Sequence, residues 1–191
     1  MRSIKLPCKT YPTGSVGGGL PVGYQECDWL ETDGSQWIDT GIIPDWNEDI
    51  EIQWCSYGGG WSMWGSDNYV YQIGYLRIFS TSAQGNYYHV AGKTFTGTYT
   101  ASTGNFVISS DGITLSVVPR GDDACAVPMY LFRRYTGLSG ERGRVMYAKI
   151  GTHHFVPALH INTQEGVMVD VSTGMVYHNK GTGAFTWQVK A

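Results

Sequence analysis

A glycine-rich stretch with several aromatic residues, Ser56–Asn68, offers the most chemistry in this 191-residue sequence. Trp61 lies between Gly60 and Ser62, and Trp46 follows Pro44 in an earlier expected loop. Exposed aromatic rings stack on the C–H faces of sugars, while neighbouring polar groups bind hydroxyls. Aromatic residues also fill the cores of β-sandwiches, which is the plain alternative. The stacking interpretation predicts a carbohydrate-binding set made up of Trp61, Trp46, Tyr57, Asp67 and Asn68.

A pair of acidic residues suggests a second kind of chemistry. In the segment Asp49–Trp54 apolar and polar residues alternate, so Asp49 and Glu51 share one face of an expected strand. Carboxylates spaced by about 7 Å along a strand suit glycoside hydrolysis. The next position on that face, however, is Gln53 rather than a third acid. A solvated strand face explains the pair as well, and we predict that the protein is not an enzyme.

Metal ligands are sparse and ambiguous. His153 and His154 are adjacent, so on a strand they point to opposite faces and cannot share one metal ion. Asp67-Asn68 and Asp122-Asp123 carry the oxygen ligands that calcium takes, although exposed loop polarity explains both pairs equally well. We therefore expect no cofactor, with calcium as an open alternative. No CxxC pair indicates zinc, and the four cysteines are expected to be free, mostly buried thiols: Cys8, Cys27, Cys55 and Cys125.

Composition limits the classes of protein to consider. Hydrophobic residues make up 42% and charged residues 15%, which is typical of a globular domain rather than a disordered chain. The formal net charge is −3, which disfavours nucleic acid as a partner. No apolar run reaches the ~18 residues of a membrane span. The first twelve residues, MRSIKLPCKTYP, contain no apolar core, so we expect no secretory signal.

The elements that must position these residues are strands. The chain has 26 glycines and 14% aromatic residues, and no segment has a helical period. Asp111-Gly112 is the strongest hairpin signal. Strand patterns begin near Tyr24 and predict an all-β, two-sheet antiparallel sandwich. After residues 49–54, the expected strands are Tyr69–Ile73, Tyr75–Ser80, Tyr87–Ala91, Gly97–Thr100, Phe106–Ser109, Thr114–Val118, Met129–Arg134, Gly143–Gly151, His154–Ala158 broken by Pro157, Gly166–Val171, Met175–His178 and Phe185–Val189.

The N-terminal residues differ in composition from the rest. Residues 1–23 contain Pro7, Pro12 and the run GSVGGGLPVG, so we divide the chain into an arm, 1–23, and a sandwich domain, 24–191. We expect the arm to anchor the domain to its own assembly or to another protein, through Leu6, Pro7, Tyr11 and Pro12. Arg133-Arg134 and Arg142-x-Arg144 form a basic cluster, interpreted either as a solvated hairpin tip or as a subunit contact.

Two segments together resemble a known family. LPVGY followed by WLETDGSQWIDTGI, and the later segment VPALHINTQEGVMVDVSTGMVYHNKGTGAF, resemble the opening and closing motifs of concanavalin A-like (laminin-G-like) jelly-roll domains. Such domains occur in bacterial surface proteins and phage virion proteins. Trp64-Gly65-Ser66 and Tyr130-Leu131-Phe132 match the family's core strands. The resemblance spans roughly residues 20–187 and leaves out residues 1–19.

The resemblance implies a jelly roll whose first and last strands are neighbours, but no single activity, because this fold serves many functions. Asp39 and Asp170, within the two motifs, are expected to accept backbone N–H groups in turns. We expect a bacteriophage virion protein (fibre, tail or capsid decoration) that is a homo-oligomer, often a trimer, contacts other virion proteins through its arm and binds cell-surface glycan. The alternative is a bacterial carbohydrate-binding adhesion module at the cell surface.

Overall fold

The computed structural model describes residues 19–44, 47–58, 64–65, 94–103, 105–110, 113–119, 128–133 and 142–191. All regular structure in these ranges is β-strand, which confirms the predicted all-β class. The strands are β1 (Tyr24–Thr32), β2 (Ile38–Asp39), β3 (Ile50–Gly58), β4 (Trp64–Gly65), β5 (Thr94–Thr100), β6 (Asn105–Ser110), β7 (Ile113–Pro119), β8 (Tyr130–Leu131), β9 (Arg142–Ile150), β10 (His153–His160), β11 (Glu165–Asp170), β12 (Met175–Tyr177) and β13 (Thr186–Val189).

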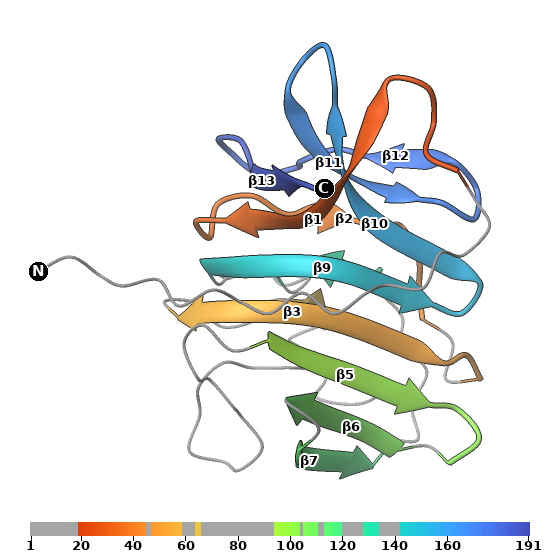
Figure 1. Ribbon diagram of the computed structural model, residues 1–191. Helices are drawn as coiled ribbons and strands as arrows, with labels where there is room; N and C mark the ends of the chain where they lie inside the picture. The colour runs from red at the N-terminus through yellow and green to blue at the C-terminus, as the bar shows by residue number, and fades with distance from the viewer. Residues whose placement is uncertain are drawn as a thin grey trace, which may run out of the picture.

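The strands form two antiparallel sheets. Ten strands make one large sheet in the order β12-β11-β10-β1-β9-β3-β5-β6-β7, with β13 paired to β1 (Figure 1). The pairing of β1 with β13 confirms that the first and last strands are neighbours. β6 and β7 pair on either side of the expected turn at residues 111–112. The other expected strands between residues 69 and 91 lie outside the described residues.

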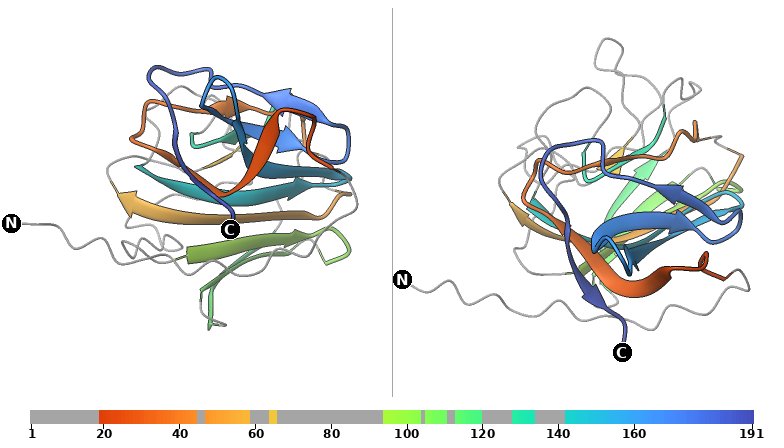
Figure 2. Two further views of the ribbon diagram at one scale, coloured as in Figure 1. Left: turned by 45° about the horizontal axis from the view of Figure 1, so that its top comes forward. Right: turned by 90° about the horizontal axis from the view of Figure 1, so that it is seen from above.

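The second sheet is small, and its three short strands lie within segments that resemble the family's opening motif and core strands. β2, β8 and β4 pair in the order β2-β8-β4 and lie behind the large sheet (Figure 2). Ile38 and Leu131, which pair across β2 and β8, are fully buried. They share one apolar core with residues on the inner face of the large sheet, including Leu30, Ile50, Ile52, Val145 and Phe155. This core between two sheets confirms the predicted sandwich.

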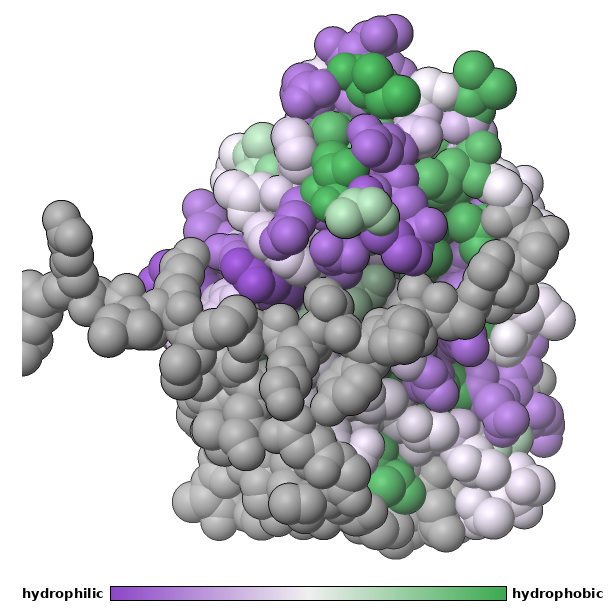
Figure 3. Space-filling view, in the orientation of Figure 1, coloured by the Kyte–Doolittle hydropathy of each residue, from purple (hydrophilic) through white to green (hydrophobic). Residues whose placement is uncertain are grey.

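A second apolar cluster lies on the outer face of β10 and β11. Val156 and Ala158 of β10 pack there with Val167 and Val169 of β11, and Leu20 lies against them. Neighbouring residues of the same two strands, such as Phe155, belong to the main core. Apolar side chains gather over this upper part of the molecule in Figure 3. Both faces of this hairpin are therefore apolar, which explains its continuous hydrophobic sequence.

β1 has three partners, and this corrects one prediction. The first residues of β1 pair with β10, and its last residues pair with β9. β9 and β10 pair with each other only near their connecting turn, and beyond that point β1 lies between them. Pro157 was expected to break a strand, but β10 continues through it to His160. β10 pairs with β9 up to Phe155 and with β1 from Ala158, so Pro157 falls between the two ladders. Its missing N–H therefore removes no hydrogen bond on that side.

The two family-like motifs contact each other directly. Trp37 donates its backbone N–H to Asn179 Oδ1 over 3.1 Å, and Lys180 donates its own to the carbonyl of Trp37 over 2.9 Å. Buried Gln36 donates through Nε2 to the carbonyl of Thr182, and its Oε1 accepts the hydroxyl of Thr32 over 2.7 Å. We call this pair of interlocked loops, residues 32–37 and 179–183, the clasp. It brings the start and the end of the sandwich together, as the resemblance implied.

The predicted turn-capping role of the two aspartates is confirmed. Asp39 Oδ1 accepts the N–H of Gly41 over 2.8 Å. Asp170 is fully buried, and its Oδ1 accepts the N–H groups of His154 and Ser172, each over 3.0 Å. Its Oδ2 contacts His153 Nδ1 at 2.8 Å and the Thr173 hydroxyl at 2.7 Å. Asp170 therefore connects β10, β11 and the turn that follows β11.

The cysteine prediction is partly wrong. Cys27 is a buried free thiol, and burial together with the nearby charges of Asp28 and Glu26 raises its pKa to about 12. Cys55, in contrast, is disulfide-bonded and fully buried on β3. Cys8 and Cys125 lie outside the described residues. An isolated cysteine within a strand carries no local signal of its pairing, because that depends on tertiary proximity.

Candidate functional site

A row of polar side chains crosses the outer face of the large sheet. Glu31 of β1 pairs with Thr186 of β13 on one side and with Arg144 of β9 on the other. Arg144 in turn pairs with Cys55 of β3. Residues directly opposite each other in adjacent strands point to the same face. Because side chains alternate along a strand, Tyr57 shares this face with Cys55.

Arg144 holds the centre of this row. Its Nε lies 2.7 Å from Glu31 Oε2, and both side chains are mostly buried. Its guanidinium carbon lies 3.8 Å from the centre of the Trp29 ring and 5.6 Å from that of Tyr57. A guanidinium over an aromatic face is attracted by the ring quadrupole. Arg144 therefore links Trp29, Glu31 and Tyr57 into one unit and fixes their positions.

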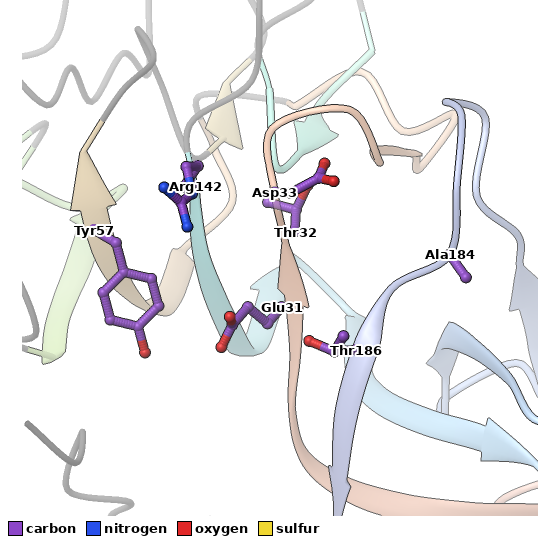
Figure 4. A pocket seen from close by; sticks show the side chains of 7 residues that line it. All are labelled: Glu31, Thr32, Asp33, Tyr57, Arg142, Ala184 and Thr186. Atoms are coloured by element: carbon purple, nitrogen blue, oxygen red, sulfur yellow. The ribbon is translucent and has the colours of Figure 1, made fainter. Parts of the chain in front are cut away.

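A small pocket of about 100 Å³ opens beside this unit. It lies where the ends of β1 and β3 meet the beginnings of β9 and β13 (Figure 4). In that view the Glu31 side chain points between Tyr57 and Thr186, and Arg142 lies at the beginning of β9. The lining residues are Glu31, Thr32, Asp33, Tyr57, Arg142, Ala184 and Thr186.

The pocket contains both donors and acceptors. The Ser35 hydroxyl and backbone N–H donate to Asp33 and lower the pKa of its carboxyl, with a smaller contribution from the charge of Arg142. Burial raises the pKa of Tyr57, which therefore keeps its phenolic proton at neutral pH. Arg142 is exposed, and among the described residues its side chain forms no hydrogen bond or ion pair. Its guanidinium is therefore a donor available to a ligand.

The structure places one of the predicted sugar-binding residues, Tyr57, in this pocket. Four others, Trp46, Trp61, Asp67 and Asn68, lie outside the described residues and stay predictions. The same holds for the predicted anchoring residues Leu6, Pro7, Tyr11 and Pro12, and for most of the arm at 1–23.

Sequence reasoning missed Trp29, Glu31 and Arg142 as neighbours of Tyr57. Trp29 and Glu31 lie on β1, Arg142 on β9 and Tyr57 on β3. Only the register between these strands, which are distant in sequence, brings the residues together. The predicted basic cluster is also divided between the two sheets. Arg133 follows β8 and lies 4.6 Å from the Trp37 ring centre, whereas Arg142 and Arg144 belong to β9. The one sequence signal for this grouping is the alternation of side chains along an expected strand, which puts Arg142 and Arg144 on the same face.

The acidic pair at the beginning of β3, Asp49 just before it and Glu51 within it, has structural partners. Asp49 Oδ1 accepts the backbone N–H of Ala101 over 2.8 Å, and Glu51 accepts the hydroxyl of Tyr147. The expectation of a fully solvated face is wrong for Gln53, which is buried and hydrogen-bonded to Thr96 Oγ1. Tyr147 of β9 pairs directly with Gln53.

Metal-binding clusters and membrane-spanning helices are both absent from the described ranges. These ranges contain no group of three or more His, Cys, Asp or Glu side chains arranged to hold a metal ion. The pairs proposed for calcium, Asp67-Asn68 and Asp122-Asp123, lie outside them. Nor do these ranges hold a helix with the length and apolarity needed to cross a bilayer.

His154 gives the fold a sensitivity to acid. It is buried with its ring nearly perpendicular to that of Tyr147, and neither ring nitrogen has a hydrogen-bond partner among the described residues. Burial lowers its pKa, and Lys149 lowers it further, against the opposing charges of Asp170, Glu26 and Glu51.

We expect stability to fall as pH decreases below about 6.5, because the unfolded chain then binds a proton that folded His154 resists. Urea unfolding from pH 8 to 5 should give a slope of at most about 1.4 kcal/mol per pH unit from this residue. The same series on His154→Gln should lack this component. An unchanged slope in the variant would assign it to another group.

The fold and pocket define an all-β, two-sheet antiparallel sandwich with a polar, aromatic-lined pocket on the outer face of its large sheet. Comparison with known proteins found no matching family model, no matching curated protein and no matching solved structure.

Proposed function

We propose that this chain is a non-catalytic recognition domain that binds glycan through the Tyr57 pocket and is displayed on a bacteriophage virion. The observation that carries the glycan-binding part is the pocket itself. Residues that carry an aromatic ring, two carboxylates, an available guanidinium and a threonine hydroxyl line it. Sugar-binding sites need the same combination, because a ring stacks on the aromatic face while its hydroxyls both donate and accept hydrogen bonds.

The non-catalytic part rests on the acidic residues. Asp49 and Glu51 already accept hydrogen bonds from Ala101 and Tyr147. Glu31 is bound by Arg144. A glycosidase needs one carboxyl group that is protonated and one that is free to attack or to activate water. The low pKa of Asp33 and the ion pair of Glu31 do not supply that combination.

The virion part rests on the sequence motifs that interlock in the clasp. They resemble the opening and closing segments of concanavalin A-like jelly-roll domains in phage virion and bacterial surface proteins. In this proposal residues 1–23 attach a homo-oligomer to another virion protein. The alternative is a bacterial surface adhesion module, for which the pocket is equally suitable. Co-purification of the protein with virus particles distinguishes the two, since an adhesion module would remain with cells.

The glycan-binding proposal is tested on a glycan array, followed by calorimetry with the strongest ligand. Tyr57→Ala should weaken binding at least tenfold, or about 1.4 kcal/mol, because it removes the stacking wall. Tyr57→Phe, which keeps the ring, should retain most of the affinity. Lys180→Ala, an exposed substitution outside the pocket, is the matched control. A silent array, or equal affinity for Tyr57→Ala and the parent, would contradict the proposal.

A further inference from the structure

The charges around the pocket identify the class of sugar that it accepts, if the proposed glycan binding holds. Glu31 and Arg144 neutralise each other at 2.7 Å, so neither contributes a net charge to a ligand. Asp33 and Arg142 remain, and they line the same pocket with opposite charges. Among the described residues, the four charged groups at and beside the pocket therefore balance.

A charged ligand would meet repulsion here. A sugar carboxylate or sulfate drawn to Arg142 would lie close to the carboxylate of Asp33, which lines the same pocket. An amino sugar drawn to Asp33 would lie close to the guanidinium of Arg142. Like charges brought together in a partly buried site weaken binding and oppose the wrong ligand.

A neutral polyol avoids both penalties. Each sugar hydroxyl donates one hydrogen bond and accepts others, so it can give to the Asp33 carboxylate and receive from the Arg142 guanidinium. Hydrogen bonds to charged partners are about twice as strong as those between neutral groups. The Thr186 hydroxyl provides a further partner on the opposite wall, and the Tyr57 ring provides an apolar face.

The size of the pocket limits how much of a glycan enters it. Its volume is about 100 Å³, well below the roughly 300–1,000 Å³ of sites that enclose drug-sized ligands. A single ring or part of one fits, rather than a run of several residues. From charge and size together, we infer that the pocket selects a neutral sugar residue at the end of a glycan over its acidic or amino counterpart.

Matched probes separate this inference from the proposed function. Calorimetry compares methyl glucoside, methyl glucuronide and methyl glucosaminide, and then the galacto series. The neutral member of the preferred series should bind at least tenfold more tightly than its charged counterparts. Asp33→Asn, which keeps the shape of the side chain but removes its charge, should reduce the preference for the neutral sugar over the uronic acid about tenfold. Lys180→Ala should leave that ratio unchanged.

Two results would overturn the inference. Acidic or amino probes that bind as tightly as the neutral one, with Tyr57→Ala abolishing the binding, would refute neutral selectivity while leaving glycan recognition intact. An unchanged ratio in Asp33→Asn would show that the charge balance does not determine selectivity. Absence of binding to every probe and to every glycan on the array would reject the inference together with the proposed function.

Discussion

Replacing Gly181 with alanine is expected to destabilise the protein by about 3 kcal/mol or more, at or above the top of the usual range for overpacking. A Cβ at Gly181 would overlap the backbone carbonyl of Ser35 and would lie 2.9 Å from Cδ1 of Trp37. A backbone carbonyl cannot move aside as the end of a long side chain can. The substitution should therefore open the clasp between residues 32–37 and 179–183.

Urea unfolding monitored by far-UV circular dichroism measures this loss. Gly19→Ala is the matched control, because no atom lies within 4 Å of a Cβ built at that position. Gly19→Ala should remain within about 0.5 kcal/mol of the parent, the usual range for surface substitutions. If Gly181→Ala is as stable as Gly19→Ala, then the clasp is not closed in solution as described. If Gly181→Ala does not fold while Gly19→Ala does, the clasp is required for folding.

Asp170→Ala should be the second most damaging substitution, with an expected loss of about 3–5 kcal/mol. The carboxylate is fully buried and has four hydrogen-bonding partners: His153, His154, Ser172 and Thr173. Removing it leaves buried donors unpaired, and such groups lose their hydration without compensation. Asp39→Ala is the matched control, because Asp39 also caps a turn but is bonded to one exposed backbone N–H. That control should lose about 1 kcal/mol.

Asp170 also predicts a pH dependence. Burial raises the pKa of its carboxyl, but the hydrogen bonds from His153, Thr173 and the two backbone N–H groups outweigh this, and the net shift is downward from 3.8. The unfolded chain therefore takes up this proton first as the pH falls. The stabilisation is complete well above pH 4 and is lost progressively below it. Urea midpoints between pH 5 and 3 should fall less steeply in Asp170→Ala than in the parent, and parallel curves would contradict this assignment.

The part of the fold that could be predicted comes from local patterns. Alternation in β3 placed Ile50, Ile52 and Trp54 in the core, and all three are buried. The short side chains of Asp39 and Asp170, within the two motifs, predicted that both residues accept backbone N–H groups in turns. Phe185, which opens the last expected strand, is buried and packs against Phe132 with the ring centres 4.7 Å apart. In each case the signal lies within a few residues.

The part that could not be predicted depends on pairing between distant strands. The register between β3 and β9 shifts at Trp54, so Val145 points into the core and Tyr147 points outward instead of sharing a face. Pro157 remains within β10 because β10 changes its partner strand from β9 to β1 at this position. The pocket likewise needs β1, β3, β9 and β13 together. Of its residues, Tyr57 was predicted from its aromatic surroundings, whereas no sequence signal placed Glu31, Asp33 or Arg142 beside it.

The location of the binding site is the most direct test of the proposed function. A ¹H–¹⁵N correlation spectrum of the labelled full chain, titrated with the methyl glycoside of the strongest ligand on the array, reports which amides change environment. The account predicts that the largest shifts occur at Glu31, Asp33, Tyr57, Arg142 and Thr186, and that they disappear in Tyr57→Ala. Shifts centred on the apolar outer face of β10 and β11, or no shifts at saturating sugar, would contradict it.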